Sequence, residues 1–153
     1  MTNPNHINFK SQPARPISFR YVGLLGIKAD STLDILKRIE AGVSFRNFEK
    51  FQRTVALPLG ELALLIQVKP RTLTRRQAEG RFQRDESDRL LRASRLFQMA
   101  VDLFEGDTAA ARIWVASSKK ALGGKTPLEF ARTEVGAGEV ENLIGRLEYG
   151  VYS

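Results

Sequence analysis

The sequence of 153 residues contains no cysteine and a single histidine, His6. The lack of cysteine excludes disulfides, thiolate zinc sites, iron–sulfur clusters and a cysteine nucleophile. The single histidine lies in a polar N-terminal stretch, which argues against a histidine-based catalytic triad or a metal site built from several histidines. We therefore expect a protein that works by binding, is not an enzyme, and holds neither a metal nor a cofactor.

Long hydrophobic runs are also missing. The longest apolar stretch, Leu62–Ile66, is far shorter than the about 20 residues needed to span a bilayer. Residues 1–5 are polar and lack the apolar run of a signal peptide. We expect a cytoplasmic protein with no membrane association.

The charge of the chain is unevenly distributed. There are 24 lysines and arginines against 17 acidic residues, for a net charge of +7, which favours a polyanionic partner. The basic excess concentrates over residues 69–84, where Glu79 is the one acidic residue. Over residues 126–153 the sign reverses, with five glutamates against two arginines. Each cluster is also compatible with an ordinary solvated face.

Helical periodicity dominates the apolar pattern. Apolar residues recur at intervals of three and four over residues 85–105 and again over residues 140–151. Residues that cap helices precede four of the expected helices. These are Ser31, Ser44, Asp107 and Thr126. No strand pattern of any length is present, so we expect an all-α fold.

Two details of these helices follow from the same reasoning. Leu36, Ile39 and Val43 recur at helical spacing and are expected to form the buried face of the first helix. Gly136 and Gly138 are expected to break the chain between two helices near the C-terminus, because glycine is a poor helix former.

The domain organisation follows from these elements. Residues 1–29 are rich in proline and are expected to form an N-terminal arm, with Ile17, Phe19 and Tyr21 alternating as a short extended piece. Residues 30–83 are expected to form a helix-turn-helix domain, and residues 84–153 a second helical domain for partner binding and dimerisation.

Residues 59–76 have the layout of a helix-turn-helix motif. Ala63 falls where the two helices cross closely, and four apolar residues fall at the core positions of such a pair. These are Leu62, Ile66, Val68 and Leu73. The sequence departs from the motif at two positions: Gln67 stands where the motif usually has glycine in the turn, and Arg76 stands where it prefers an aliphatic residue.

The second helix of this motif lies in the most basic stretch of the chain. In such motifs the N-terminal residues of this helix meet base edges in the major groove, and flanking cations meet phosphates. Arginine pairs with guanine, and threonine can touch a thymine methyl. The expected base contacts are Arg71, Thr72, Thr74 and Arg75, and the expected phosphate contacts are Lys69, Arg76 and Arg81. Because one copy would bind operator DNA weakly, we expect a homodimer that reads two half-sites.

The C-terminal half carries the most specific strings. Trp114, the string LGGKTPL over residues 122–128 and the end GRLEYGVYS over residues 145–153 resemble the Xre/MbcA/ParS family of type II antitoxins. The resemblance covers roughly residues 57–153 and joins the helix-turn-helix to the toxin-binding domain of that family. One departure is Ser117–Lys120, where the family often has a proline-rich turn.

The resemblance implies a partner and a mechanism. It implies a RES-domain toxin, an enzyme that depletes NAD, whose active-site cleft is covered by the C-terminal segment of the antitoxin. It also implies that the antitoxin, or its complex with the toxin, represses its own operon. By this analogy the toxin-binding residues are Arg146, Glu148, Tyr149, Tyr152 and Ser153.

Two alternatives remain open at this point. The two tyrosines could pack back on Trp114 and serve the core, and the whole chain could be a free-standing dimeric transcriptional regulator whose C-terminal domain only dimerises.

Overall fold

The computed structural model describes residues 21–150, which contain α-helices and short 3₁₀ turns and no strand. The expectation of an all-α fold is confirmed. None of the helices between residues 21 and 150 combines the length and the apolar character needed to cross a membrane.

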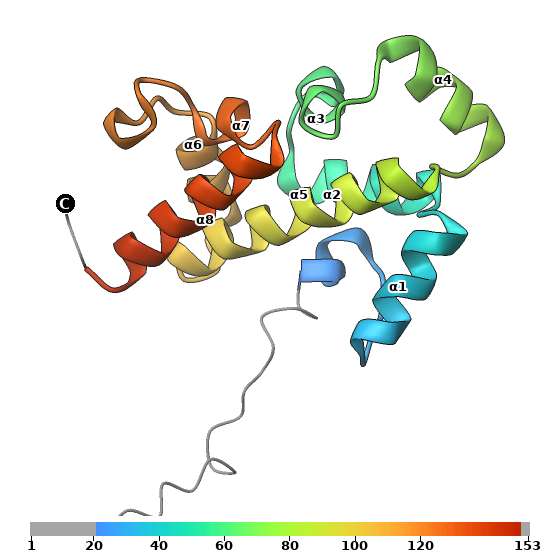
Figure 1. Ribbon diagram of the computed structural model, residues 1–153, viewed down its shortest axis with the longest axis horizontal. Coiled ribbons are helices and arrows are strands. Elements are labelled where there is room, and N and C mark those ends of the chain that lie inside the picture. The colour runs from blue at the N-terminus through green and yellow to red at the C-terminus, as the bar shows by residue number, and fades with distance from the viewer. Residues whose placement is uncertain (1–20, 151–153) are drawn as a thin grey trace, which may run out of the picture.

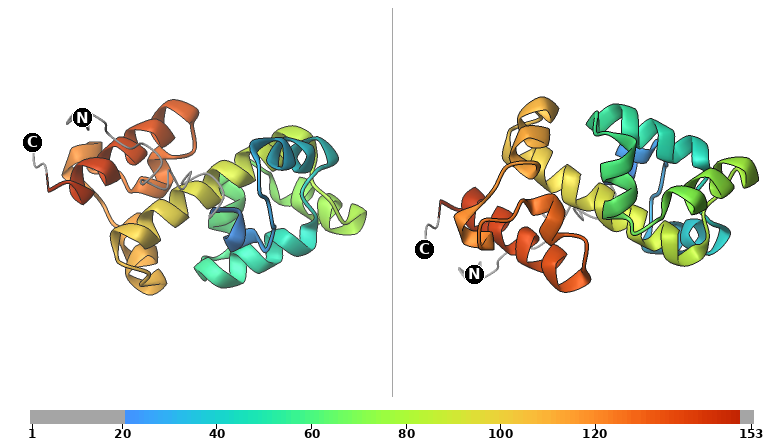
Figure 2. Two further views of the ribbon diagram at one scale, coloured as in Figure 1. Left: turned by 90° about the horizontal axis from the view of Figure 1, so that it is seen from below. Right: turned by 90° about the horizontal axis from the view of Figure 1, so that it is seen from above.

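The long helix α5, Arg84–Leu103, crosses the middle of the molecule and contacts elements from both ends of the chain (Figure 1). Before it come the 3₁₀ turn η1, Tyr21–Leu25, and the helices α1, Thr32–Ala41, α2, Phe45–Val55, α3, Leu59–Leu65, and α4, Pro70–Glu79. After it come α6, Thr108–Val115, the 3₁₀ turn η2, Lys120–Leu122, α7, Pro127–Phe130, and α8, Glu134–Glu148. Figure 2 shows that α1 and α4 lie at one end of the molecule and α6 to α8 at the other.

The predicted capping residues all begin helices. The side-chain oxygens of Ser31, Ser44, Asp107 and Thr126 each accept a hydrogen bond from the backbone N–H three residues later, over 3.0–3.1 Å. Each bond satisfies one of the N–H groups that have no partner within the first turn of a helix. The boundaries at these four helix starts are therefore set by local sequence.

Phenylalanines join the N-terminal helices to α5. The rings of Phe48 and Phe82 meet edge to face at 5.1 Å, and Phe45 stacks on Phe82 at 5.6 Å. Phe51 meets Phe97 of α5 edge to face at 5.7 Å. These rings are buried, and their burial supplies much of the hydrophobic stabilisation of this unit.

The predicted buried face of α1 is wrong in part. Leu36 is 51% exposed, whereas Ile35 is buried and Ile39 packs against the core. The helix turns Ile35 and Ile39 inward and leaves Leu33 and Leu36 in solvent. Val43 is buried as expected, but it follows the helix.

The predicted break at Gly136 and Gly138 is also wrong, because both residues lie inside α8. A Cβ at Gly136 would come within 1.7 Å of the carbonyl oxygen of Phe130, so glycine is required where α8 passes the end of α7. The chain turns before α8, and Thr133 caps the helix by accepting a hydrogen bond from the N–H of Gly136 over 3.0 Å.

The last part of the predicted N-terminal arm belongs to the folded core. Tyr21 begins a 3₁₀ turn and is not extended, and Val22, Leu25 and Ile27 are buried. The side-chain amide of Asn47 on α2 donates to the carbonyl oxygen of Leu25 over 2.7 Å. Residues 21–29 are therefore part of the first helical unit. The rest of the predicted arm, with Ile17 and Phe19, lies outside the described residues.

Candidate nucleic-acid interface and C-terminal binding surface

The turn between α3 and α4 closes as a helix-turn-helix in spite of its missing glycine. Gln67 adopts the left-handed conformation with φ 57°, the region that glycine usually supplies. The N–H of Val68 bonds the carbonyl oxygen of Ala63 over 2.9 Å, and the N–H of Gln67 bonds that of Leu64 over 3.1 Å. This is the Schellman pattern of a helix C-terminus, with buried Val68 and Ala63 as its apolar pair.

The same turn is tied to the rest of the molecule by two side chains. The amide nitrogen of Gln67 donates to the carbonyl oxygen of Arg132, between α7 and α8. The Nε of Arg89 on α5 donates to the carbonyl oxygen of Ile66 over 2.7 Å. The α3–α4 turn is thus held by α5 and by the C-terminal unit, which comprises the elements from α6 to α8.

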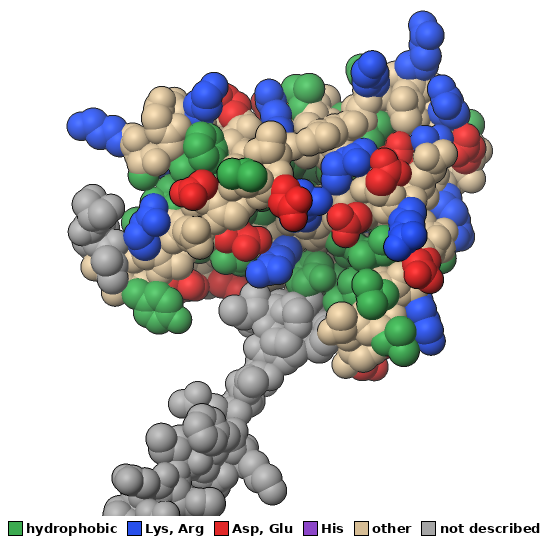
Figure 3. Space-filling view, viewed as in Figure 1, with side chains coloured by type: hydrophobic (Ala, Val, Ile, Leu, Met, Phe, Trp, Pro, Cys, Tyr) green, Lys and Arg blue, Asp and Glu red, His purple; other side chains and the backbone are tan. Residues whose placement is uncertain are grey.

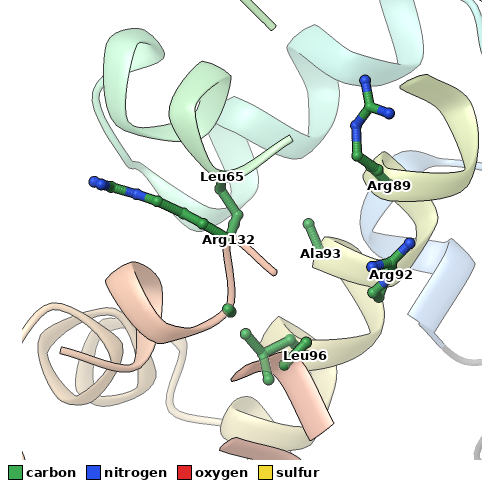
Figure 4. Close-up of a pocket in the computed structure, with 8 residues that line it drawn as sticks. Leu65, Arg89, Arg92, Ala93, Leu96 and Arg132 are labelled. Atoms are coloured by element: carbon green, nitrogen blue, oxygen red, sulfur yellow. The ribbon is translucent and has the colours of Figure 1, made fainter. Parts of the chain in front are cut away.

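A small cavity lies at this junction. Leu65 of α3 and Ala93 and Leu96 of α5 line it, while the guanidinium groups of Arg89 and Arg132 point away from it (Figure 4). Its volume is ≈ 10 Å³, about the space that one water molecule occupies. The junction is therefore a packing contact between the two units, with no room for a ligand.

Helix α4 presents a cationic outer face. Leu73 points into the core, and the opposite face carries Arg71, Thr74 and Arg75, all exposed. In Figure 3 lysine and arginine side chains gather over α4, at the upper right of the molecule. A helix with this face is suited to enter the major groove of DNA, where arginines bond guanine edges.

The remaining residues predicted to contact DNA occupy different places around α4. Lys69 is exposed at the N-cap position, and Thr72 is half-buried at the edge of the outer face. The hydroxyl of Thr74 donates to the carbonyl oxygen of Pro70 over 3.1 Å. Arg81 follows the helix, is exposed, and donates from Nη1 to the carbonyl oxygen of Ala41 over 2.6 Å.

Arg76 does not lie on the outer face, so the prediction that it contacts phosphate is wrong. It is only 5% exposed, and its guanidinium binds Glu86 of α5 through Nε at 2.6 Å and Nη2 at 3.1 Å. A third bond runs to Glu79 at 3.2 Å. The hydrogen bond with Glu86 raises the pKa of Arg76 above its ordinary value. Arg76 therefore fills the core position where the motif prefers an aliphatic residue, with a buried carboxylate as its partner.

The C-terminal unit buries one face of α8 and exposes the other. Val140 and Ile144 are fully buried. On the opposite face Val135 is 80% exposed and Tyr149, just past the end of the helix, is 83% exposed. Gly138 and Gly145 lie between them on the same face, and a Cβ at either glycine would meet nothing within 4 Å. We refer to residues 135, 138, 142, 145 and 149 as the outer strip of α8.

The residues predicted to bind a toxin lie at or beyond the end of α8. Tyr149 and Glu148 are exposed and Arg146 is half-buried, whereas Tyr152 and Ser153 lie outside the described residues. One alternative expects Tyr149 to pack on Trp114, but Tyr149 is exposed and does not do so. The Nζ of Lys119 lies 4.9 Å from the centre of the Trp114 ring instead, and burial lowers the pKa of Lys119.

Sequence reasoning missed two features of these surfaces. The sequence does not single out Glu86 as the partner of Arg76, although an arginine at an aliphatic position predicts a buried acid nearby. The outer strip of α8 was also missed, although its spacing of three and four residues on the face opposite Val140 could have been read from a helical projection.

Comparisons with known proteins match both halves of the chain. The family model described as "Antitoxin Xre-like helix-turn-helix domain" matches residues 34–95. The model described as "Antitoxin Xre/MbcA/ParS C-terminal toxin-binding domain" matches residues 99–150. The border between the two matches falls within α5, the helix that contacts both units.

Three curated relatives are each named "Antitoxin Xre". The protein from Yersinia enterocolitica serotype O:8 / biotype 1B is 37% identical over 130 residues, which cover 84% of this chain and 88% of the relative. The protein from Photorhabdus laumondii subsp. laumondii is 35% identical over 75% of this chain and 78% of its own length. That from Pseudomonas putida is 33% identical over 43% of this chain and 41% of its own. The chain thus belongs to the Xre/MbcA/ParS family of antitoxins of toxin–antitoxin systems, with a helix-turn-helix domain followed by a toxin-binding domain.

Proposed function

We propose that this antitoxin neutralises a RES-domain, NAD-depleting toxin by covering the active site of the toxin with its C-terminal segment. We propose further that it binds operator DNA through α4 and so represses its own operon in the cytoplasm. In this account the chain acts by occlusion and recognition, performs no catalysis and needs no cofactor.

The observation that carries the toxin-binding proposal is the exposure of Tyr149 at the end of α8. An aromatic side chain that is 83% exposed gains most when a partner buries it. The outer strip leads to it along α8, and its two glycines allow a partner backbone to approach closely. Arg146 and Glu148 add charged hydrogen-bonding groups beside it. Tyr152 and Ser153 follow in the sequence and are also proposed to contact the toxin.

The DNA-binding proposal rests on the face of α4 opposite Leu73. Arg71, Thr72, Thr74 and Arg75 are proposed to contact base edges, and Lys69 and Arg81 to contact phosphates. Since the two surfaces lie at opposite ends of the molecule (Figure 1), one chain can hold toxin and DNA at the same time. A homodimer would place two copies of α4 on two half-sites of the operator.

The proposal expects the gene for a RES-domain toxin beside that of this antitoxin, and the purified product of that gene is used in the test. NAD consumption by the toxin is followed while the antitoxin is titrated in. The proposal expects stoichiometric loss of NAD consumption and a stable complex in gel filtration. A complex in which the toxin keeps full activity would contradict occlusion of its active site.

The DNA-binding proposal is tested by footprinting the antitoxin, alone and with toxin, on the promoter region of its own operon. Protection of two half-sites by a dimer is expected. Protection of DNA by a chain that binds no toxin would instead favour a free-standing dimeric transcriptional regulator.

A further inference from the structure

A hollow of ≈ 610 Å³ lies between α1 and the start of α2, and Arg81 closes one side of it. Four cationic side chains and a single carboxylate line it. The cations are Lys28, Lys37, Arg38 and Arg81, and the carboxylate is Asp34. The lining therefore carries a net charge of +3, although the cations come from three separate stretches of sequence.

The negative charge in this hollow is already engaged by the backbone. The carboxylate of Asp34 accepts a hydrogen bond from the N–H of Asp30 over 3.0 Å and lies in the first turn of α1. The bond from Asp30 holds the pKa of Asp34 below its ordinary value. The positive end of the helix dipole offsets this charge further. Among the described residues, no salt bridge engages Lys28, Lys37 or Arg38, although the charge of Lys37 also helps to lower the pKa of Asp34.

Arg81 is held in place at the edge of the hollow. Its Nη1 donates to the carbonyl oxygen of Ala41 at the end of α1, and its side chain lies 3.0 Å from the position of a Cβ at Gly42. The backbone on either side of Arg81 is also hydrogen-bonded. The carbonyl oxygen of Gly80 accepts from the N–H of Phe45, and the N–H of Phe82 donates to the carbonyl oxygen of Val43, both over 2.9 Å. A guanidinium fixed in this way loses little conformational freedom when it binds an anion.

The hollow and the proposed DNA surface share Arg81. Arg81 follows α4 directly and is itself one of the proposed phosphate contacts, and α1 and α4 lie at the same end of the molecule (Figure 2). We propose that the hollow is a second phosphate site, which holds the DNA backbone beside the bases that α4 reads. This inference rests on the proposed function of α4 and extends the footprint to Lys28, Lys37 and Arg38.

The test compares the full-length antitoxin with Lys37→Gln/Arg38→Gln on the promoter fragment that the wild type protects. The control, Lys120→Gln/Lys125→Gln, removes the same charge from exposed lysines of the C-terminal unit. If the hollow holds phosphates, the first variant should bind at least about tenfold more weakly in 0.1 M salt, and the slope of log K against log salt should become shallower by about 1–2. The control should match the wild type.

Sequence discrimination provides a second readout. Because phosphate contacts carry no sequence information, the ratio of operator binding to random-DNA binding should stay unchanged in Lys37→Gln/Arg38→Gln. The variant Lys28→Gln/Lys37→Gln should behave in the same way, and equal thermal unfolding of all proteins would show that folding is intact.

Two results would overturn the proposal. Affinity and salt slope equal to those of the wild type would show that the hollow contacts no phosphate, while DNA binding by α4 would stand. If the wild-type protein fails to bind its promoter, alone or with toxin, both the proposed DNA-binding function and the proposed phosphate site are contradicted.

Discussion

Arg76 of α4 and Glu86 of α5 form a buried bidentate ion pair, with both side chains less than a tenth exposed. Glu86 also accepts a hydrogen bond from the N–H of Gln83 over 2.8 Å, so one carboxylate caps α5 and receives the guanidinium. The pair fixes the proposed recognition helix to the long helix on which both units are built.

Breaking this pair from one side should be costly. Arg76→Met leaves Glu86 buried without its counter-charge and should lower the free energy of unfolding by about 3–5 kcal/mol. The double variant Arg76→Met/Glu86→Leu removes both charges and should recover most of that loss. Urea unfolding of the full chain measures the free energy of unfolding of the single and the double variant. A single variant as stable as the wild type would show that water or a neighbouring cation replaces Arg76.

The left-handed turn at Gln67 should be strained. Gln67→Gly and Gln67→Ala both remove the hydrogen bond to Arg132, but only glycine tolerates φ 57° without cost. The glycine variant should therefore be about 1 kcal/mol more stable than the alanine variant. Thermal unfolding of the two proteins side by side checks this, and equal stabilities would argue against strain at the turn.

Gly136 and Gly138 of α8 should respond in opposite ways to alanine. Gly136→Ala places a Cβ against the carbonyl oxygen of Phe130 and should destabilise the protein by about 1–3 kcal/mol. Gly138→Ala meets open space within the same helix and should stabilise it by up to about 1 kcal/mol. Thermal unfolding of the two variants measures both effects, and each variant is the control for the other. A change of the same sign in both midpoints would contradict the close contact between α8 and the end of α7.

These positions show where sequence reasoning succeeds and where it stops. Ser31, Ser44 and Thr126 begin helices because their hydroxyls bond N–H groups three residues away, an interaction that local sequence contains in full. The low helix propensity of glycine predicts a break at Gly136, whereas in the structure Gly136 makes close contact with Phe130 of another helix. Tertiary packing overrides propensity at that position.

The candidate sites show the same limit. The outer face of α4 could be predicted, because Leu73 fixes which side of the helix is buried. The burial of Arg76 could not, since its partner Glu86 lies on another helix, and neither could the hollow beside Arg81, whose other cations precede it by about 40 residues or more.

Tyr149 should be an energetic centre of the toxin interface. Tyr149→Ala removes an exposed ring that we propose is buried in the complex, and it should weaken toxin binding by about 2 kcal/mol or more, roughly 30-fold. Leu36→Ala is a matched control, because Leu36 is 51% exposed on the other unit. Titration calorimetry with the purified toxin measures both. Equal affinities for the two variants would remove Tyr149 from the interface.

The central claim is that toxin neutralisation and operator recognition reside on opposite ends of one helical body. The most direct measurement scores rescue from the co-expressed toxin and promoter binding for two variants, a deletion of residues 150–153 and the double variant Arg71→Ala/Arg75→Ala. The account predicts that the deletion loses rescue and keeps promoter binding. It also predicts that the arginine variant keeps rescue and loses about 1–3 kcal/mol of operator-specific binding for each guanine contact. Full rescue by the deleted chain, or unchanged operator discrimination by the arginine variant, would contradict it.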